Sequence, residues 1–116
     1  MDLGLSVRED RGWTVLVVTG ELDMATAPTV RERLHALLAE GHDKMIVDLD
    51  GVGFLDSTAL GVLVGVLKRV RTQGGDLRLV STQARVLKVF EITRLDQAFA
   101  IHDSVDAAVT DCGAWS

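Results

Sequence analysis

Apolar residues along this 116-residue chain alternate between two spacings, and this alternation restricts the class of fold. Short, nearly continuous apolar runs, typical of buried β-strands, are separated by longer segments in which apolar residues recur every three or four positions, as on one face of a helix. A strand followed by such a helix and then a second strand places the two strands side by side and parallel in one sheet. The pattern therefore predicts an α/β domain.

We expect a mixed sheet of about five strands and about four helices, in the order β-β-α-β-α-β-α-β-α. The strands are expected at residues 3–8, 13–19, 45–49, 77–80 (with Arg78 pointing away from the apolar side) and 98–101. The helices are expected between a capping Thr26 and a terminating Gly41, at 57–73, from 82 or 83 to 92, and from 103 or 104 to 110. The segment at 9–12 is too short for a crossover, so the first two strands form an antiparallel hairpin.

The length fits a single domain, which we place at residues 1–110 with a short tail at 111–116. The net charge of −5 disfavours binding to nucleic acid or to an anionic membrane surface. The apolar run at 59–67 is far shorter than the roughly 18 residues of a membrane-spanning helix. The lone Cys112 forms no internal disulfide and the N-terminus resembles no signal peptide, so we expect a cytoplasmic protein.

The motif Asp56-Ser57-Thr58 opens the second predicted helix, after a strand and an expected loop with two glycines. Asp56 is a favourable N-cap, which makes Ser57 the first helical residue. Unpaired N–H groups and the positive end of the helix dipole favour an anion there. A phosphate on Ser57 would be tolerated while presenting about −1.5 to −2 charges to a partner. The alternative is that Asp56 and Ser57 only cap the helix.

The same helix has two faces. Its apolar stripe, expected to face the core, contains Leu60, Leu63, Val64, Leu67 and Val70. A separate side carries Ser57, Gly61, Gly65 and Lys68. A glycine inside a helix costs roughly 1 kcal/mol relative to alanine, so either another element of the fold or a binding partner is expected to lie against the glycines. Val62 and Val66, at the edge of the stripe, could enlarge an exposed apolar patch.

Three segments resemble the STAS domain, and most closely the small stand-alone anti-sigma factor antagonists of bacteria. They are G-E-L-D-M-A-T-A-P at 20–28, D-L-D-G-V-G-F-L-D-S-T-A-L-G at 48–61 and R-V-L-K-V-F-E-I-T-R-L-D-Q-A-F-A-I-H at 85–102. The resemblance covers nearly the whole chain. It implies a single STAS-like domain whose central mixed sheet has its helices mainly on one face.

The resemblance also implies a function and a set of partners. The unphosphorylated protein would bind an anti-sigma factor and so free a sigma factor. That anti-sigma factor is typically also a serine kinase of the histidine-kinase-like ATPase type, which would phosphorylate Ser57 and dissociate the complex. A phosphatase of the PP2C type would reverse the reaction.

The residues implied in partner binding are Asp23, Asp56, Ser57, Thr58, Gly61, Gly65 and Lys68. Thr58 stands where many relatives carry a second serine, and it is a minor alternative phosphorylation site. Asp23 matches an acidic loop residue of the family and could contact the kinase or order the phosphorylation site. We expect neither a cofactor nor a metal.

Three alternatives compete with this interpretation. A hydrolase would need a base beside the serine, but His35, His42 and His102 are scattered along the chain, so we expect no enzyme. A phospho-aspartate receiver could use Asp48 or Asp50 as the phosphate acceptor. A receiver also needs a lysine after a late parallel strand, and this chain has none there. A STAS regulatory subunit of a membrane transport complex, without a phosphorylation switch, stays open, because a fold alone does not decide a function.

Overall fold

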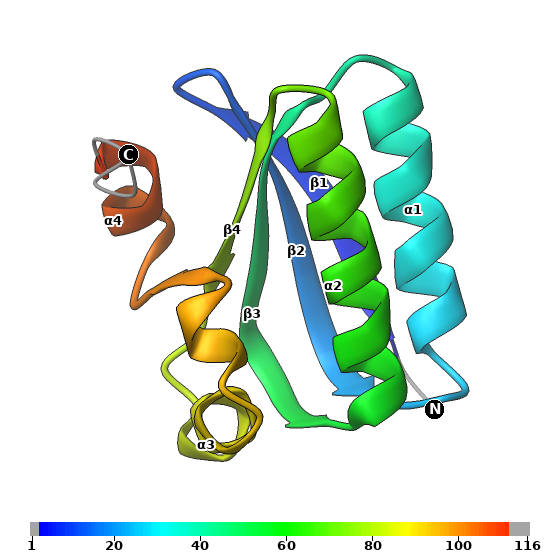
Figure 1. The fold of residues 1–116 in the computed structure, drawn as a ribbon, viewed down its shortest axis with the longest axis vertical. Helices are drawn as coiled ribbons and strands as arrows, with labels where there is room; N and C mark the ends of the chain where they lie inside the picture. Colours follow the sequence, from blue (N-terminus) through cyan, green and yellow to red (C-terminus); the bar gives the residue numbers. More distant parts are fainter. Residues whose placement is uncertain (1–2, 112–116) are drawn as a thin grey trace.

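The computed structural model describes residues 3–111 and contains one sheet in the order β1-β2-β3-β4-β5 (Figure 1). The strands are β1 (Gly4–Asp10), β2 (Trp13–Leu22), β3 (Lys44–Leu55), β4 (Asp76–Val80) and β5 (Ala100–His102). Only β1 and β2 pair antiparallel, and the other three pairs are parallel. The helices within the described range are α1 (Ala27–Ala39), α2 (Ser57–Thr72), α3 (Ala84–Ile92), the 3-10 helix η1 (Leu95–Gln97) and α4 (Val105–Thr110). The predicted mixed α/β sheet is confirmed.

A two-residue turn sets the register between β1 and β2. Arg11 and Gly12 have positive φ angles of 48° and 88°, as a type I′ turn requires. Asp10 therefore pairs directly with Trp13, and the pairing continues without a bulge to Gly4 opposite Thr19. This is the hairpin that the short polar segment predicted.

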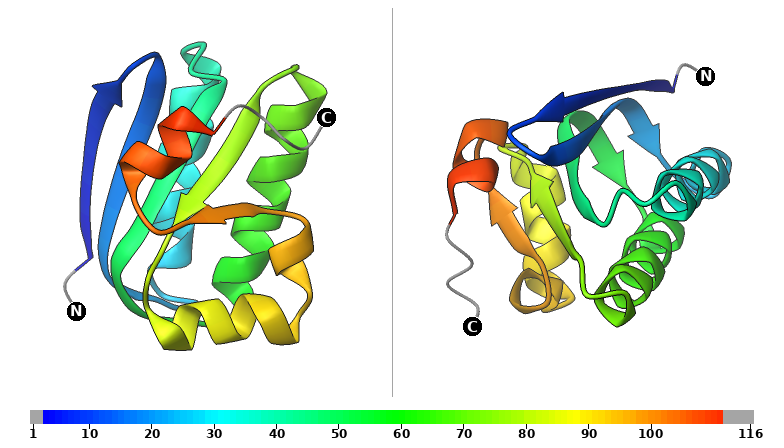
Figure 2. Two further views of the ribbon diagram at one scale, coloured as in Figure 1. Left: turned by 90° about the vertical axis from the view of Figure 1, so that its left-hand side faces the viewer. Right: turned by 90° about the horizontal axis from the view of Figure 1, so that it is seen from above.

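Three helices cover one face of the sheet and α4 covers the other (Figure 2). The main apolar cluster joins α1, α2 and α3 to the sheet, and aliphatic side chains supply most of it. Two aromatic residues, Phe90 and Phe99, meet in it edge to face with ring centroids 5.7 Å apart. The expectation that the helices lie mainly on one face is confirmed.

The second face is small and is organised by one buried cation. Trp13, Val15, Ile46, Val80 and Ala108 form its apolar cluster. The guanidinium of Arg78, only 5% exposed, lies 4.3 Å from the centre of the Trp13 ring. Its Nη1 donates to the Ala108 carbonyl at 2.6 Å and to the Asp111 carbonyl at 3.0 Å. Arg78 points away from the main core, as predicted, but it is buried because α4 lies on it.

β3 extends six residues beyond its predicted end at Leu49, through the glycines that were expected to form a loop. It stays paired with β2 as far as Leu55, across two register shifts in the ladder. Gly51 allows this close approach, since a Cβ there would lie 2.7 Å from the Thr19 Cγ2 atom. The longer strand brings the start of α2 to the end of β2. Within residues 3–111, no helix is both long and apolar enough to cross a membrane.

The contacts of Arg78 predict a large stability loss on truncation. Arg78→Ala leaves the buried Ala108 carbonyl without its donor and removes the cation from the Trp13 ring. The free energy of unfolding should fall by about 2 to 3 kcal/mol in urea titrations. Arg71→Ala is the matched control, because Arg71 is exposed and donates a single bond to the Ala98 carbonyl; it should lose under about 1 kcal/mol. An equal decrease in the free energy of unfolding in Arg78→Ala and Arg71→Ala would contradict this role of Arg78.

Candidate functional site

The carboxylate of Asp56 links the start of α2 to the loop between β2 and α1. Its Oδ1 accepts from the Ala59 N–H at 3.0 Å, and its Oδ2 accepts from the Met24 N–H at 3.0 Å. Its own N–H donates to the Leu22 carbonyl at 3.1 Å. The predicted N-cap is therefore confirmed, with a second bond that the sequence did not predict. This one side chain fixes two loops relative to each other.

Ser57 is the first residue of α2, as predicted, and both Ser57 and Thr58 are exposed. Within the described residues, neither of their backbone N–H groups has an acceptor, as is usual in the first turn of a helix. The Ser57 hydroxyl is thus open to solvent beside free donors and the carboxylate of Asp56. A phosphate on Ser57 would lie near these N–H groups and the positive end of the helix dipole, which stabilise its negative charge.

Asp23 orders the loop that contacts Asp56. Its Oδ1 accepts from the N–H groups of Ala25 at 2.9 Å and Thr26 at 3.1 Å. Thr26 is the N-cap residue of α1, as predicted, but its side chain makes no capping bond to the helix, because its hydroxyl donates to the Glu21 carbonyl at 2.7 Å. Asp23 and Thr26 together close the turn and present the N–H of Met24 to Asp56.

The exposed side of α2 carries Gly61, Gly65 and Lys68, which lie on the surface as predicted. A Cβ added at either glycine would meet no atom within 4 Å. Within residues 3–111, close packing by another element of the fold is therefore excluded as the reason for these glycines. The prediction that Val66 could add to an exposed patch is also wrong, since Val66 is 1% exposed, and Val62 is half-buried.

Two exposed apolar side chains stand on the segments that meet at Asp56, and both were missed by the sequence analysis. Met24 is 74% exposed in the loop that contacts Asp56, and Phe54 is 43% exposed two residues before Asp56. The sequence does contain an indication of exposure at each position, since Met24 stands in a polar turn and Phe54 follows a glycine. We define the Ser57 surface as Met24, Phe54, Ser57, Thr58, Gly61, Gly65 and Lys68.

Asp50 connects β3 to the segment that follows β4. Its Oδ1 accepts from the Thr82 hydroxyl at 2.6 Å and from the Thr82 N–H at 2.8 Å. These bonds, the hydroxyl first, lower the pKa of the Asp50 carboxyl below its ordinary value, against a smaller opposing effect of burial. The carboxylate that a receiver would phosphorylate is thus already hydrogen-bonded to its own fold.

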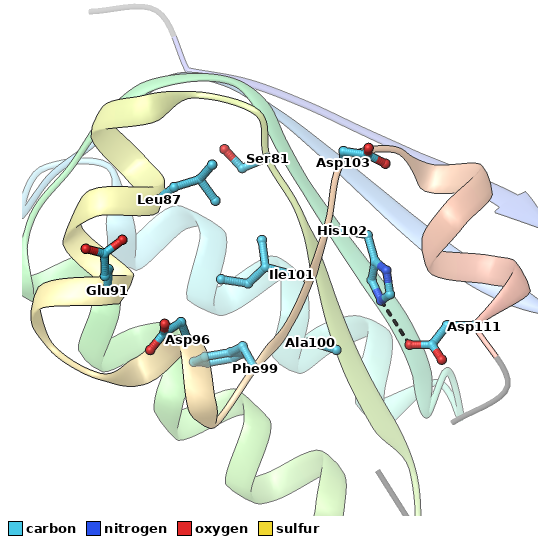
Figure 3. Close-up of a pocket in the computed structure, with 10 residues that line it drawn as sticks. All are labelled: Ser81, Leu87, Glu91, Asp96, Phe99, Ala100, Ile101, His102, Asp103 and Asp111. Atoms are coloured by element: carbon cyan, nitrogen blue, oxygen red, sulfur yellow. Dashed lines mark ion pairs between the residues drawn. The ribbon is translucent and has the colours of Figure 1, made fainter. Parts of the chain in front are cut away.

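A pocket of about 510 Å³ lies between α3, β5 and α4, away from the Ser57 surface (Figure 3). Four carboxylates line it, together with Ser81 and a His102–Asp111 ion pair of 3.2 Å. The Ser81 hydroxyl accepts from the Gln83 N–H at 3.2 Å, and among residues 3–111 no hydrogen bond joins it to His102. The same range contains no group of three side chains placed to hold a metal. None of the predicted site residues lines this pocket.

The family follows from comparison with known proteins. The model of the STAS domain matches residues 5–108 of this chain. The chain belongs to the STAS domain family. This STAS domain is 35% identical over 109 residues to an anti-sigma-B factor antagonist from Bacillus subtilis, covering 94% of this chain and 99% of that protein.

Solved structures agree with this assignment. An anti-sigma factor antagonist from Mycobacterium paratuberculosis has a TM-score of 0.87 and 27% identity, covering 94% of this STAS domain and 92% of that chain. A putative anti-sigma factor antagonist from Thermotoga maritima has a TM-score of 0.85 and 28% identity, covering 90% of each chain. The predicted resemblance and fold are thereby confirmed.

The two bonds of Asp56 predict distinct effects for two substitutions. Asp56→Ala loses the N-cap and the bond to Met24, so the free energy of unfolding should fall by about 2 kcal/mol. Asp56→Asn keeps a side-chain oxygen that can still accept from Ala59, so it should lose less than half as much. Urea denaturation followed by circular dichroism measures both. Equal stability of the two variants would contradict a stabilising role for the hydrogen bonds of Asp56.

The lowered pKa of Asp50 predicts an acid-dependent stability. Because its pKa is lower in the folded chain, the Thr82 contacts stabilise the fold above about pH 3.9, and this contribution is lost as the pH falls through the folded-state pKa. The stability difference between the natural protein and Thr82→Val should therefore shrink below about pH 4. Thr72→Val is the control, because the Thr72 hydroxyl donates to a carbonyl and its effect should not vary with pH. Carboxyl NMR titration should show the pKa of Asp50 rising in Thr82→Val.

Proposed function

We propose that this chain is an anti-sigma factor antagonist whose binding is switched off by phosphorylation of Ser57. The observation that carries the proposal is the 35% identity to an anti-sigma-B factor antagonist over nearly the full length of both chains. The unphosphorylated protein binds an anti-sigma factor and so frees a sigma factor. The protein works by binding, and it needs no catalytic group of its own.

The Ser57 surface supports this proposal as the region that the anti-sigma factor covers. Met24 and Phe54 offer apolar contact, which association between proteins favours. Gly61 and Gly65 have open space where side chains would stand, so a partner's backbone can approach α2 closely. Lys68 adds a positive charge on the same helix, and Asp23 acts indirectly by ordering the loop.

Phosphorylation would change this surface by charge and by size. A hydroxyl can be buried at modest cost when the partner supplies a hydrogen bond. A phosphate adds about −1.5 to −2 charges that must stay hydrated or meet a cation. Asp56 adds repulsion of roughly 3 kcal/mol per unit-charge pair at about 6 Å and an effective dielectric of 20, before screening by salt. A loss of about 2.7 kcal/mol in binding is a hundredfold loss in affinity.

The kinase in this proposal is the anti-sigma factor itself, a serine kinase of the histidine-kinase-like ATPase type. Ser57 suits a kinase substrate because its hydroxyl is exposed at the first position of α2. Thr58, also exposed, is the secondary candidate. A PP2C-type phosphatase would restore the hydroxyl, and the cycle would take place in the cytoplasm.

Substitutions at Ser57 test the switch. Ser57→Ala should bind the anti-sigma factor kinase of the same genome with affinity within a few-fold of the natural protein, and ATP should not weaken its binding. Ser57→Asp should bind at least tenfold more weakly, because it places a fixed charge where the partner covers the helix. Isothermal titration calorimetry gives the affinities, and intact mass gives the phosphorylation.

Thr58→Ala is the matched control for Ser57→Ala. It should still gain one phosphate with ATP and lose affinity by about a hundredfold when it does. Phosphate on Thr58→Ala but not on Ser57→Ala identifies the site. Release of Ser57→Ala from the kinase by ATP would contradict the proposal. So would equal affinity of the phosphorylated and unphosphorylated natural protein for its partner, which is the behaviour expected of a STAS regulatory subunit without a phosphorylation switch.

A further inference from the structure

Among the described residues 3–111, no strand pairs with the outer edge of β1, which is seven residues long (Figures 1 and 2). Across a two-residue turn, Asp10 and Trp13 form a hydrogen-bonded pair, so alternate residues of β1 direct their N–H and C=O groups toward β2. The N–H and C=O groups of Leu5, Val7 and Glu9 therefore point out of the sheet, at the spacing that an added strand would need.

Sheet edges are ordinarily protected by charge, by shortness or by covering elements. The opposite edge is short, since β5 has three residues. The charges of β1 stand at its turn end, on Arg8, Glu9 and Asp10, and none lies between Gly4 and Val7. The half of β1 away from the turn thus has no charged side chain that would oppose pairing.

The flank of α1 beside β1 has a self-complementary surface. A shallow groove of about 240 Å³ runs there, lined by Leu5, Thr29, Glu32, Arg33 and Ala36. Leu5, which lines the groove, and Val7, two residues further along β1, are only half-buried. Glu32 and Arg33 carry opposite charges, and among residues 3–111 neither forms an ion pair.

We propose that a second copy of this chain occupies this edge, with the two β1 strands paired antiparallel about Ser6. A two-fold axis brings a surface against itself, so the surface must complement itself. Centring on Ser6 places Leu5 opposite Val7 of the second copy, twice. This register also places Leu3, just before β1, opposite Glu9. Centring on Val7 would instead place Leu5, within the strand, opposite Glu9, and centring on Arg8 would oppose like charges, which is unfavourable.

The same axis sets the two α1 helices side by side and antiparallel. Thr29 and Ala36 are small enough for a close approach, and Glu32 then faces Arg33 of the second copy on both sides of the axis. α1 lies between this edge and α2, so the pairing leaves the Ser57 surface uncovered (Figure 2). The pairing is independent of the proposed switch, and a dimer would present two Ser57 surfaces.

Sedimentation velocity over a range of concentrations tests the pairing on the full chain. The natural protein should change from monomer to dimer as its concentration rises. Glu32→Arg and Arg33→Glu should each weaken dimerisation about tenfold, because each brings like charges together at two symmetric positions. The double exchange E32R/R33E should restore it. A protein that stays monomeric at all concentrations, or a double exchange that dimerises no better than the single variants, overturns the proposal.

Cross-linking tests the register. In a Cys112→Ser background, Ser6→Cys should form an intermolecular disulfide under mild oxidation, because the two Ser6 residues face each other across the axis at a Cα separation of about 4.5 Å. Arg8→Cys is the matched control, since its two copies would stand about four residues apart along the strands, beyond the reach of a disulfide. Equal cross-linking of the two variants, or cross-linking of Arg8→Cys alone, overturns the register.

Discussion

One carboxylate determines the shape of the proposed binding surface. Asp56 accepts from the first turn of α2 with one oxygen and from the Met24 N–H with the other, while its own amide bonds to the end of β2. The start of α2 and the segment from Leu22 to Met24, more than thirty positions apart in the sequence, are thereby fixed beside Ser57. The exposed hydroxyl, the apolar side chains beside it and the open face of α2 all depend on this arrangement. A surface held this firmly can respond to a phosphate by a local change in charge, with no change of fold.

The residues around Ser57 fall into two groups: some hold the loop in place, and others are exposed to a partner. Asp23 and Thr26 have their polar groups engaged within the loop, so they support the Ser57 surface from behind. Met24 is 74% exposed and Phe54 is 43% exposed, so both side chains are available to a partner. The acidic pocket beside β5 is separate from both groups, and within the described residues the hydroxyl of its serine is not hydrogen-bonded to the imidazole of its histidine.

Most of the fold could be predicted from the sequence because it rests on local signals: the strand and helix periods, a two-residue hairpin turn, and an aspartate that caps α2. The errors arise where partners distant in sequence decide. Gly51 looked like part of a loop, yet it is the residue that lets β3 continue beside Thr19. Thr26 is a case with a nearer partner: it stands at the N-cap of α1, yet its hydroxyl donates to the carbonyl of Glu21, five positions earlier, and does not cap the helix. The second bond of Asp56, to Met24, could not be predicted, because no local pattern encodes a contact across 32 positions.

The cover of the second sheet face has a consequence for local opening. α4 has only six residues, and a single guanidinium holds the carbonyl of Ala108 within it and that of Asp111 just after it. A helix of this length at the end of the described residues opens more often than the central strands do. Its amides should exchange with solvent deuterium well before those of β3, and each opening would uncover the indole of Trp13. In a Trp115→Phe background, which leaves Trp13 as the sole tryptophan, the intrinsic fluorescence thus monitors the opening of α4.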